Sequence, residues 1–425
     1  MRITIDFLMV LVTTFITIRS IRLIEKYKSN SLSDWAIFLL YIFQTLPVVF
    51  DMIIGIPQYN RWFLGFAKAM ANDTVCIVYD LYLLSVNIAL MIVSKRSQEK
   101  GAQECTSNLF EITKSVPNFV LFLLVLSPMI HVLLSGNLSS FSTYDSFNER
   151  ELKSGFTELN SVLIIISILA LMIWYFRREK TLIRTMALLV FSFLIIWISG
   201  KRYSVVTILF SFLYMNALEC RDPRHRINVR ALLVVMGVAV IVYSVYYITV
   251  VKVTANSDFE SVYTALRIDF GRDDVVKFTI WKEYIKGEHI LEYPLQTIIS
   301  SIFMAVPRFM FPLKGYPHYR YLTAAIYNTN ILKIPAGMTP SILEMMISNF
   351  RYFGMPLCIA FLCWYCRKAD KATTSVQHYC YAMVLVGMLT QSLDSMIVIF
   401  YMVIYFILAS EVKFTIGKTR LKKRF

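Results

Sequence analysis

The strongest constraint on this chain is a series of apolar blocks, many of them about twenty residues long, separated by short polar gaps. A stretch of that length can form a helix that crosses the hydrocarbon layer of a bilayer. Only 17% of the 425 residues are charged and 57% are hydrophobic, whereas a soluble domain keeps about a quarter of its residues charged. So few charges cannot cover a water-soluble globule of this size. The sequence therefore predicts an all-α, polytopic integral membrane protein that forms a single membrane domain over 1–425.

The apolar pattern predicts about eleven transmembrane helices. They are expected at 3–18, 35–56, 73–94, 117–135, 159–176, 182–199, 203–218, 231–250, 341–363, 378–394 and 396–410. The first block begins at Ile3 with no cationic segment before it and no small-residue cleavage site after it. It is therefore expected to be a retained span rather than a signal peptide.

The Lys and Arg residues predict the orientation, because short loops rich in these residues stay in the cytoplasm. More than half of the 43 Lys and Arg residues lie in alternate gaps. These gaps are 19–34, 95–115, 177–184, 219–230, 364–377 and 411–425. We therefore expect the N-terminus outside and the C-terminus in the cytoplasm. The net charge of +15 is then a mark of topology, and no nucleic-acid partner is expected.

The seven cysteines are scattered and odd in number, so they imply no disulfide framework. Cys363 and Cys366 form a C-x-x-C pair, but they lie in an apolar run with no second pair at zinc spacing. Small core residues are the preferred interpretation. The sequence predicts neither a metal site nor a cofactor.

The segment 251–340 is the one long extracytoplasmic connection that this topology leaves. Acids and bases are balanced up to Glu292, and Asp273 and Asp274 are expected to begin a short amphipathic helix that ends near Gly287. From Tyr293 through Leu343 there is no acidic residue at all. The extracytoplasmic segment thus has a balanced half and an acid-free, cationic half.

The acid-free half contains PLQTIISSIFMAVP (294–307), which is apolar but too short to span, so it is expected to lie at the interface or to re-enter the membrane. It is followed by RFMFPLKGYPHYRY (308–321), where cations alternate with aromatic residues. One interpretation is a membrane-surface loop, with aromatic rings among the lipid headgroups and cations on lipid phosphate. The other is a ligand cleft, in which Arg and Lys bind a phosphate or pyrophosphate and aromatic rings contact a sugar or a polyprenyl chain.

Further cations and one acid join these candidates. Lys201 and Arg202 form the turn between two expected spans, where they either reach lipid phosphate or bind an anionic ligand. Arg267 and Arg272 either add to an anion site or are neutralised by Asp269, Asp273 and Asp274 nearby in the sequence. Glu344 is expected at membrane depth beside the acid-free half, where a carboxylate could act as a base or pair with Arg.

Three segments resemble the O-antigen and capsule repeat-unit polymerases, the Wzy-type membrane glycosyltransferases. They are SGKRYS (199–204), AVPRFMFPLKGY (305–316) and GMTPSILEMMISNFRYFG (337–354). The many-span architecture with one large outer loop is also similar. In this family the last segment usually has a Gly just before the Glu, where this chain has Leu343, so the transfer of a role to Glu344 is weakened.

The resemblance implies a bacterial plasma-membrane enzyme that transfers a glycan from undecaprenyl pyrophosphate to a hydroxyl of the next lipid-linked repeat unit. No nucleotide sugar is needed, and a flippase and a chain-length regulator are the protein partners it implies. Candidate bases for the hydroxyl are His318 and Glu344. The candidate pyrophosphate- or glycan-binding residues are Lys201, Arg202, Arg267, Arg272, Arg308, Lys314, Tyr319 and Arg320.

Two alternative functions stay open. An O-antigen ligase uses a similar donor and scaffold, and the sequence separates it poorly from a polymerase. A lipid-linked oligosaccharide flippase or another transporter would place charged groups along a path through the spans. This sequence instead concentrates its cations on one face of the membrane.

Overall fold

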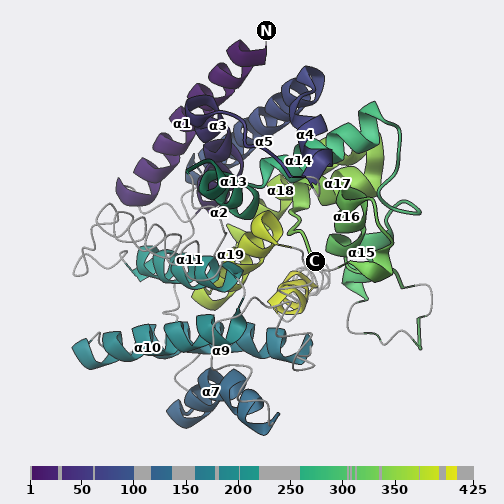
Figure 1. Cartoon of the computed structure of the whole chain (residues 1–425). Helices are drawn as coiled ribbons and strands as arrows, with labels where there is room; N and C mark the ends of the chain where they lie inside the picture. Colours follow the sequence, from purple (N-terminus) through teal and green to yellow (C-terminus); the bar gives the residue numbers. More distant parts are fainter. Residues whose placement is uncertain are drawn as a thin grey trace, which may run out of the picture.

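The computed structural model describes residues 2–26, 31–60, 63–99, 116–135, 158–177, 181–200, 202–219, 259–303, 306, 309–311, 314–334, 337–372, 374–391 and 399–408. All regular elements within these ranges are helices, which confirms the predicted all-α class (Figure 1). Helices α1, α3, α4 and α5 lie at one end of the molecule, and α7, α9 and α10 at the other.

Helices α1 (Arg2–Lys26) and α5 (Asp73–Glu99) run parallel and pack against each other. Their N-termini are joined by Arg2, which lies 3.5 Å from an Asp73 carboxylate oxygen. Between them in sequence come α2 (Leu32–Leu40), the π-helical turn η1 (Tyr41–Thr45) and α3 (Leu46–Ile54), one continuous helical segment that runs back the other way. Ser94 near the end of α5 donates to Asp34 at the start of α2 over 2.8 Å, so this segment is antiparallel to α1 and α5. This is the order that three consecutive spans require.

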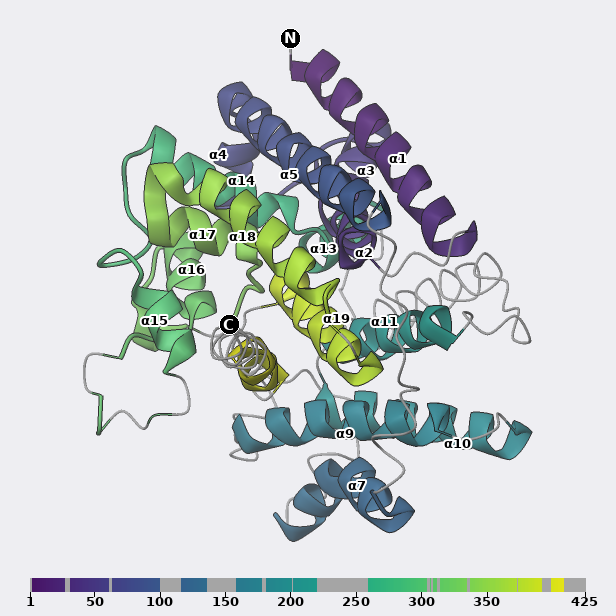
Figure 2. The ribbon, with the colours of Figure 1, turned by 180° about the vertical axis from the view of Figure 1, so that it is seen from behind.

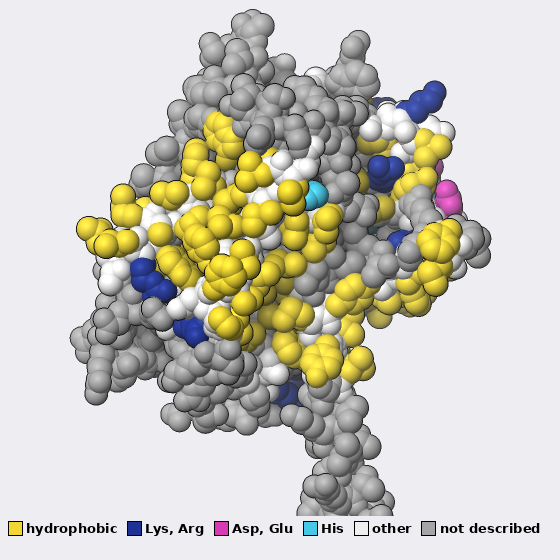
Figure 3. All heavy atoms as spheres, turned by 90° about the horizontal axis from the view of Figure 1, so that it is seen from below, with side chains coloured by type: hydrophobic (Ala, Val, Ile, Leu, Met, Phe, Trp, Pro, Cys, Tyr) yellow, Lys and Arg dark blue, Asp and Glu magenta, His cyan; other side chains and the backbone are white. Residues whose placement is uncertain are grey.

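A peripheral layer is formed by α7 (Asn118–Leu134), α9 (Glu158–Phe176) and α10 (Leu182–Ser199). Figures 1 and 2 show α9 and α10 crossing the molecule in one layer, with α7 on their outer side. Seen from that side, hydrophobic side chains occupy most of the described surface (Figure 3). Among the side chains of α7 and α10, Phe119, Leu182, Ile183 and Phe193 are at least 60% exposed. A face of this kind is suited to lipid and unsuited to water.

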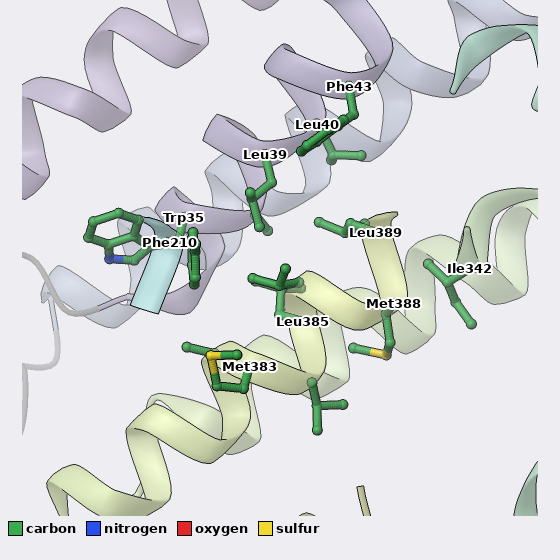
Figure 4. Packing of buried hydrophobic residues seen from close by; sticks show 14 of the residues in the cluster. Trp35, Leu39, Leu40, Phe43, Phe210, Ile342, Met383, Leu385, Met388 and Leu389 are labelled. Carbon is green, nitrogen blue, oxygen red and sulfur yellow. The ribbon is translucent and has the colours of Figure 1, made fainter. Parts of the chain in front are cut away.

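The core is built where α2 meets α11 (Arg202–Glu219) and α19 (Ser375–Thr390). Trp35 of α2 contacts Phe210 of α11 edge to face, with ring centroids 5.6 Å apart. Leu39 and Leu40 face Leu385 and Leu389 of α19 across the same contact (Figure 4). These side chains are buried, and they fix the middle of the bundle.

The described part of the segment predicted to be extracytoplasmic, from Phe259 onward, packs into the bundle as a series of short helices. They are α13 (Phe259–Phe270), α14 (Asp273–Ile280) with the π-turn η5 (Trp281–Ile285), α15 (Gln296–Ile302), α16 (His318–Tyr327) and the 3-10 turn η6 (Ile331–Lys333). The helix predicted to begin at Asp273 is present, and all eight residues of α14 are buried. It packs against α5, α17 and the short α4 (Leu64–Met70), so it is an internal element rather than a surface one.

Helix α17 (Ile342–Phe350), the 3-10 turn η7 (Arg351–Phe353) and α18 (Gly354–Ala369) form a helical hairpin where one continuous span was expected at 341–363. Cys358 Sγ of α18 lies 3.9 Å from the carbonyl oxygen of Ile342 at the start of α17. Sixteen residues of straight helix would separate these positions by about 24 Å. The chain therefore folds back at η7, where Arg351 has a φ of 51°.

Five helical segments in the described ranges are long and apolar enough to cross a membrane: Arg2–Glu25, Leu32–Ile54, Asp73–Ser97, Leu182–Ser199 and Ile342–Ala369. The last of these is the folded-back pair α17–α18. Shorter apolar helices lie at Asn118–Leu134, Val162–Phe176, Tyr203–Leu218 and Ile399–Leu408. A multi-pass membrane protein follows from this set, while the count of eleven spans stays a prediction. The expected span at 231–250 lies outside the described residues.

Candidate functional site

Helix α15 has its polar and apolar faces reversed relative to a helix on a water-soluble protein. Gln296, Thr297, Ser300 and Ser301 are buried, whereas Ile302 is 45% exposed and the adjacent Phe303 46% exposed. A helix in water turns its apolar side inward. The reversed arrangement suits an apolar exterior such as lipid and leaves a polar interior behind the helix.

The interior side of α15 meets α16 and α17 in what we call the polar network: Gln296, Thr297, Ser300, His318, Tyr321 and Asn349. Gln296 Nε2 donates to the Tyr321 hydroxyl over 2.8 Å, and the backbone N–H of Tyr316 donates to the same hydroxyl over 3.2 Å. Gly315 packs so closely here that a Cβ would stand 2.9 Å from Ser300 Oγ. The polar network is thus closely packed, and none of its six members is acidic or cationic at neutral pH.

Asn349 of α17 anchors α15 to the bundle. Its carbonyl oxygen accepts from the backbone N–H of Leu295 over 3.2 Å, and its side chain bonds to the first turn of α15. Leu295 has a φ of 65°, a conformation that is strained for a branched residue. The start of α15 is therefore held in place by α17 at a conformational cost.

His318 is fully buried, and its Nδ1 lies 3.2 Å from Thr297 Oγ1. Its Nε2 has no hydrogen-bonding partner among the described residues. Burial lowers the pKa of His318 to about 3, so the ring is neutral at physiological pH. A general base works best with a pKa near the operating pH, and this environment favours a hydrogen-bonding role for His318 over the predicted basic one.

Glu344 forms a capping box with Ser341 at the start of α17. Its carboxylate accepts from both the backbone N–H and the hydroxyl of Ser341, and the side chain is fully buried. Arg272 lies within electrostatic range. A helix cap accounts for this geometry, and a role for Glu344 as a base stays a prediction.

Arg267 lies in a second group of residues, the carboxylate–cation cluster: Asp51, Tyr59, Tyr263, Arg267, Asp273, Asp274 and Lys277. Its guanidinium binds Asp51 through two hydrogen bonds of 2.9 and 2.7 Å. It also lies 2.7 Å from Asp273 and 3.0 Å from Asp274. Of the two interpretations left open for Arg267, this geometry supports neutralisation by carboxylates over binding of an external anion.

Lys277 completes the cluster, with Nζ 2.9 Å from Asp273 and 4.7 Å from the centroid of the Tyr79 ring. Burial opposes ionisation of Asp273, but Arg267 and Lys277 outweigh it and lower the pKa of this carboxyl. At Asp274 the effects that raise the pKa outweigh those that lower it. Burial and the neighbouring Asp273 and Asp51 raise the pKa of Asp274 to about 7, despite Arg267.

The other predicted binding residues that the structure describes lie near the polar network or beside the carboxylate–cation cluster. Lys314 is half-buried and donates to the Val306 carbonyl over 2.9 Å. Arg320 of α16 is half-buried and stacks on Tyr316, with 5.4 Å between the guanidinium carbon and the ring centroid. Tyr319 packs on Gly337, where a Cβ would stand 2.7 Å from its ring.

Arg272 is buried at the N-terminal end of α14. Its backbone N–H donates to the carbonyl of Phe43 in η1 over 3.0 Å. Its side chain contacts the Gly271 carbonyl at 3.3 Å. Arg272 thus lies at the start of α14 within electrostatic range of Glu344, whereas Arg320 lies in α16, the helix that also carries His318.

Lys201, Arg308 and the side chain of Arg202 lie outside the described residues, so their predicted roles have no structural counterpart. The hairpin that carries Lys201 and Arg202 is present: α10 ends at Ser199, Gly200 has a φ of 58°, and α11 begins at Arg202. Ser199 and Ser204 are hydrogen-bonded across it at 2.6 Å.

Sequence reasoning missed Gln296, Thr297 and the role of Asn349. Thr297 and Gln296 lie in an apolar stretch, and no pattern marks them as facing inward. Asn349 belongs to the motif-like segment 337–354, but only the fold brings it to α15. Asp51 was a polar residue in an expected span, a signal that does point to a buried partner.

Comparison with known protein families, characterised proteins and solved structures finds no match to this chain.

Proposed function

We propose that this protein is a membrane glycosyltransferase that polymerises undecaprenyl-pyrophosphate-linked oligosaccharide repeat units into O-antigen, capsule or exopolysaccharide in the bacterial plasma membrane. The observation that best supports this proposal is the reversed polarity of α15. A polyprenyl-linked substrate needs an apolar surface for its tail and a polar site for its head. Here an apolar surface and a polar network lie on opposite sides of one seven-residue helix.

The cations beside the polar network would hold the pyrophosphate. Lys314 precedes α16 and Arg320 lies within it, and both are half-buried. Charge builds up on the leaving pyrophosphate as the glycosidic bond breaks, so fixed cations and N–H donors at that point lower the barrier. In this proposal Lys201, Arg202 and Arg308 supply further cations, Tyr319 contacts the glycan, and Glu344 is the candidate base.

The deciding experiment is incubation of the purified protein with a lipid-linked repeat unit, followed by separation of the products by length. A ladder of longer glycans is expected. The R320A variant should form polymer about 100-fold more slowly, which is the loss typical of one electrostatic contact to the transition state. K333A removes an exposed cation from the same acid-free segment and should behave as the wild type. Equal rates for R320A and the wild type would refute the role of Arg320, and the absence of any ladder would refute the polymerase.

A lipid-linked oligosaccharide flippase is the second candidate, and the carboxylate–cation cluster is the observation that favours it. Transporters place paired charges close to their spans, and this cluster joins α3 to α13 and α14. In addition, the carboxyl groups of Asp6 in α1 and Asp80 in α5 lie close enough to interact. Transbilayer movement of a fluorescent lipid-linked substrate in vesicles, without any ladder, would favour the flippase.

A further inference from the structure

The side-chain amide of Asn349 has a single possible orientation. The backbone N–H groups of Thr297 and Ile298 lie 3.1 and 3.4 Å from its Oδ1. The carbonyl oxygen of Met345 lies 2.7 Å from its Nδ2. Backbone N–H groups only donate and carbonyl oxygens only accept, so exchanging Oδ1 and Nδ2 would set donors against donors. Nδ2 therefore donates its other proton to Thr297 Oγ1, 2.7 Å away.

This orientation determines what the Thr297 hydroxyl can do. Its oxygen accepts from Asn349, and its single proton needs an acceptor. Within the described residues the acceptor in reach is His318 Nδ1, at 3.2 Å. A neutral imidazole that accepts at Nδ1 carries its proton on Nε2. The chain of hydrogen bonds from Asn349 through Thr297 to His318 thus selects one tautomer.

We propose that Asn349 and Thr297 are positioning residues that hold His318 as an Nε2–H donor to a phosphoryl oxygen of a polyprenyl pyrophosphate. The buried Nε2 meets no acceptor among the described side chains and backbone groups, so its hydrogen bond is unused within the protein, and this is the position that we assign to a ligand oxygen. The identity of the ligand rests on the proposed function, whereas the tautomer follows from the contacts alone.

A neutral N–H donor suits this position chemically. Burial lowers the pKa of His318 to about 3, so the ring stays neutral and Nε2 stays protonated across the physiological range. No proton is transferred. The donor stabilises negative charge on the leaving pyrophosphate oxygen, in a buried setting where such a hydrogen bond is stronger than in water.

The tautomer is tested by nitrogen NMR of the full chain in nanodiscs with labelled histidine, using H318N to assign the resonances. At pH 7 we expect His318 Nδ1 to be unprotonated and Nε2 to be protonated. The T297V variant keeps the shape of the side chain but removes the hydroxyl, and should abolish this preference, while T297S should keep it. S348A, which removes a hydroxyl bonded within α17, is the matched control and should leave the spectrum unchanged. Unchanged resonances of the other histidines report that each variant is folded.

A protonated Nδ1 in the wild type, a cationic ring at pH 7, or an unaltered His318 spectrum in T297V would each overturn the assignment. These readouts do not depend on enzymatic activity, so they separate a failure of this inference from a failure of the polymerase proposal.

The ligand is tested by adding undecaprenyl pyrophosphate or undecaprenol to the same nanodiscs. The pyrophosphate should shift the Nε2 resonance and the alcohol should not. A shift with both, or with neither, would contradict a phosphoryl partner.

In the polymerisation reaction T297V should lower kcat about 100-fold at unchanged KM for the lipid-linked donor, and T297S should restore it. H318Q, whose amide N–H can replace Nε2–H, should keep more activity than H318N, and the reverse order would contradict the donor role.

Discussion

At the scale of single residues, burial determines which role several charged groups can have. Arg267 is the clearest example, because the sequence leaves it either as an anion-binding residue or as a neutralised one. In the structure Asp51, Asp273 and Asp274 surround it, and Gly271 leaves no room for a Cβ beside its guanidinium. Breaking such a buried network by removing one partner typically costs about 3–5 kcal/mol, so these residues are expected to hold α13 and α14 on α3.

Asp274 makes this cluster sensitive to pH. It faces Arg267, Asp273, Asp51, Lys277 and Tyr59, and its pKa is raised to about 7 from the ordinary 3.8. A raised pKa in the folded state contributes stability that is full below the unfolded value and is lost as pH rises through the folded value. The free energy of unfolding should therefore fall by about 1 kcal/mol between pH 6 and pH 8 through this group.

Thermal unfolding of the protein in detergent at several pH values tests this prediction. The D274N variant should remove most of the decrease between pH 6 and pH 8. D73N, at a carboxylate that is 70% exposed, should leave it in place. A steeper decrease in D274N than in the wild type would contradict the assignment.

At the scale of elements, the hairpin of α17 and α18 decides where the candidate site lies. Gly354 begins α18 in close contact with α17, because a Cβ there would stand 2.4 Å from Ile347 Cα and 2.5 Å from the Met346 carbonyl oxygen. Both are backbone atoms that cannot move aside without distorting α17. The hairpin in turn places Asn349 in contact with α15 and Glu344 within electrostatic range of Arg272.

The G354A variant is therefore expected to be destabilised by more than about 3 kcal/mol, through overpacking against the backbone. G287A is a useful comparison, because Gly287 has a φ of 66° with open space around it and its replacement should cost about 1 kcal/mol. Melting temperatures of the two variants and the wild type measure the difference. A larger loss for G287A than for G354A would show that the close approach is unimportant.

At the scale of the whole molecule, connections far apart in sequence meet at two opposite ends of the spans. Asp370 after α18 accepts from Ser31 Oγ and Leu32 N before α2, over 2.9 and 2.8 Å. At the other end of α2–α3, the Tyr59 hydroxyl donates to Asp274 over 2.8 Å. Gaps 19–34 and 364–377, predicted to share the cytoplasmic side, thus meet in space, as do two of the gaps predicted outside.

Which end is cytoplasmic can be tested with single cysteines in a variant that lacks the native ones. G287C should react with a membrane-impermeant thiol reagent from outside the plasma membrane. K371C, at an exposed residue next to Asp370, should react only after the membrane is opened. The opposite pattern would reverse the proposed orientation, and equal labelling of both from outside would contradict their placement on opposite sides of the membrane.

The sequence by itself determined the helical class, the membrane setting, the hairpin at Gly200 and the start of the helix at Asp273. These features depend on local composition, apolar length and capping, which are readable along the chain. It could not determine that α17 folds back on α18, that α14 is buried on every side, or that Thr297 and Asn349 meet His318. Those outcomes depend on which helices pack together, and packing joins residues such as Thr297 and Asn349 that no sequence spacing relates. Only the tertiary structure decided that Arg267 is paired within the protein and that His318 presents a buried nitrogen.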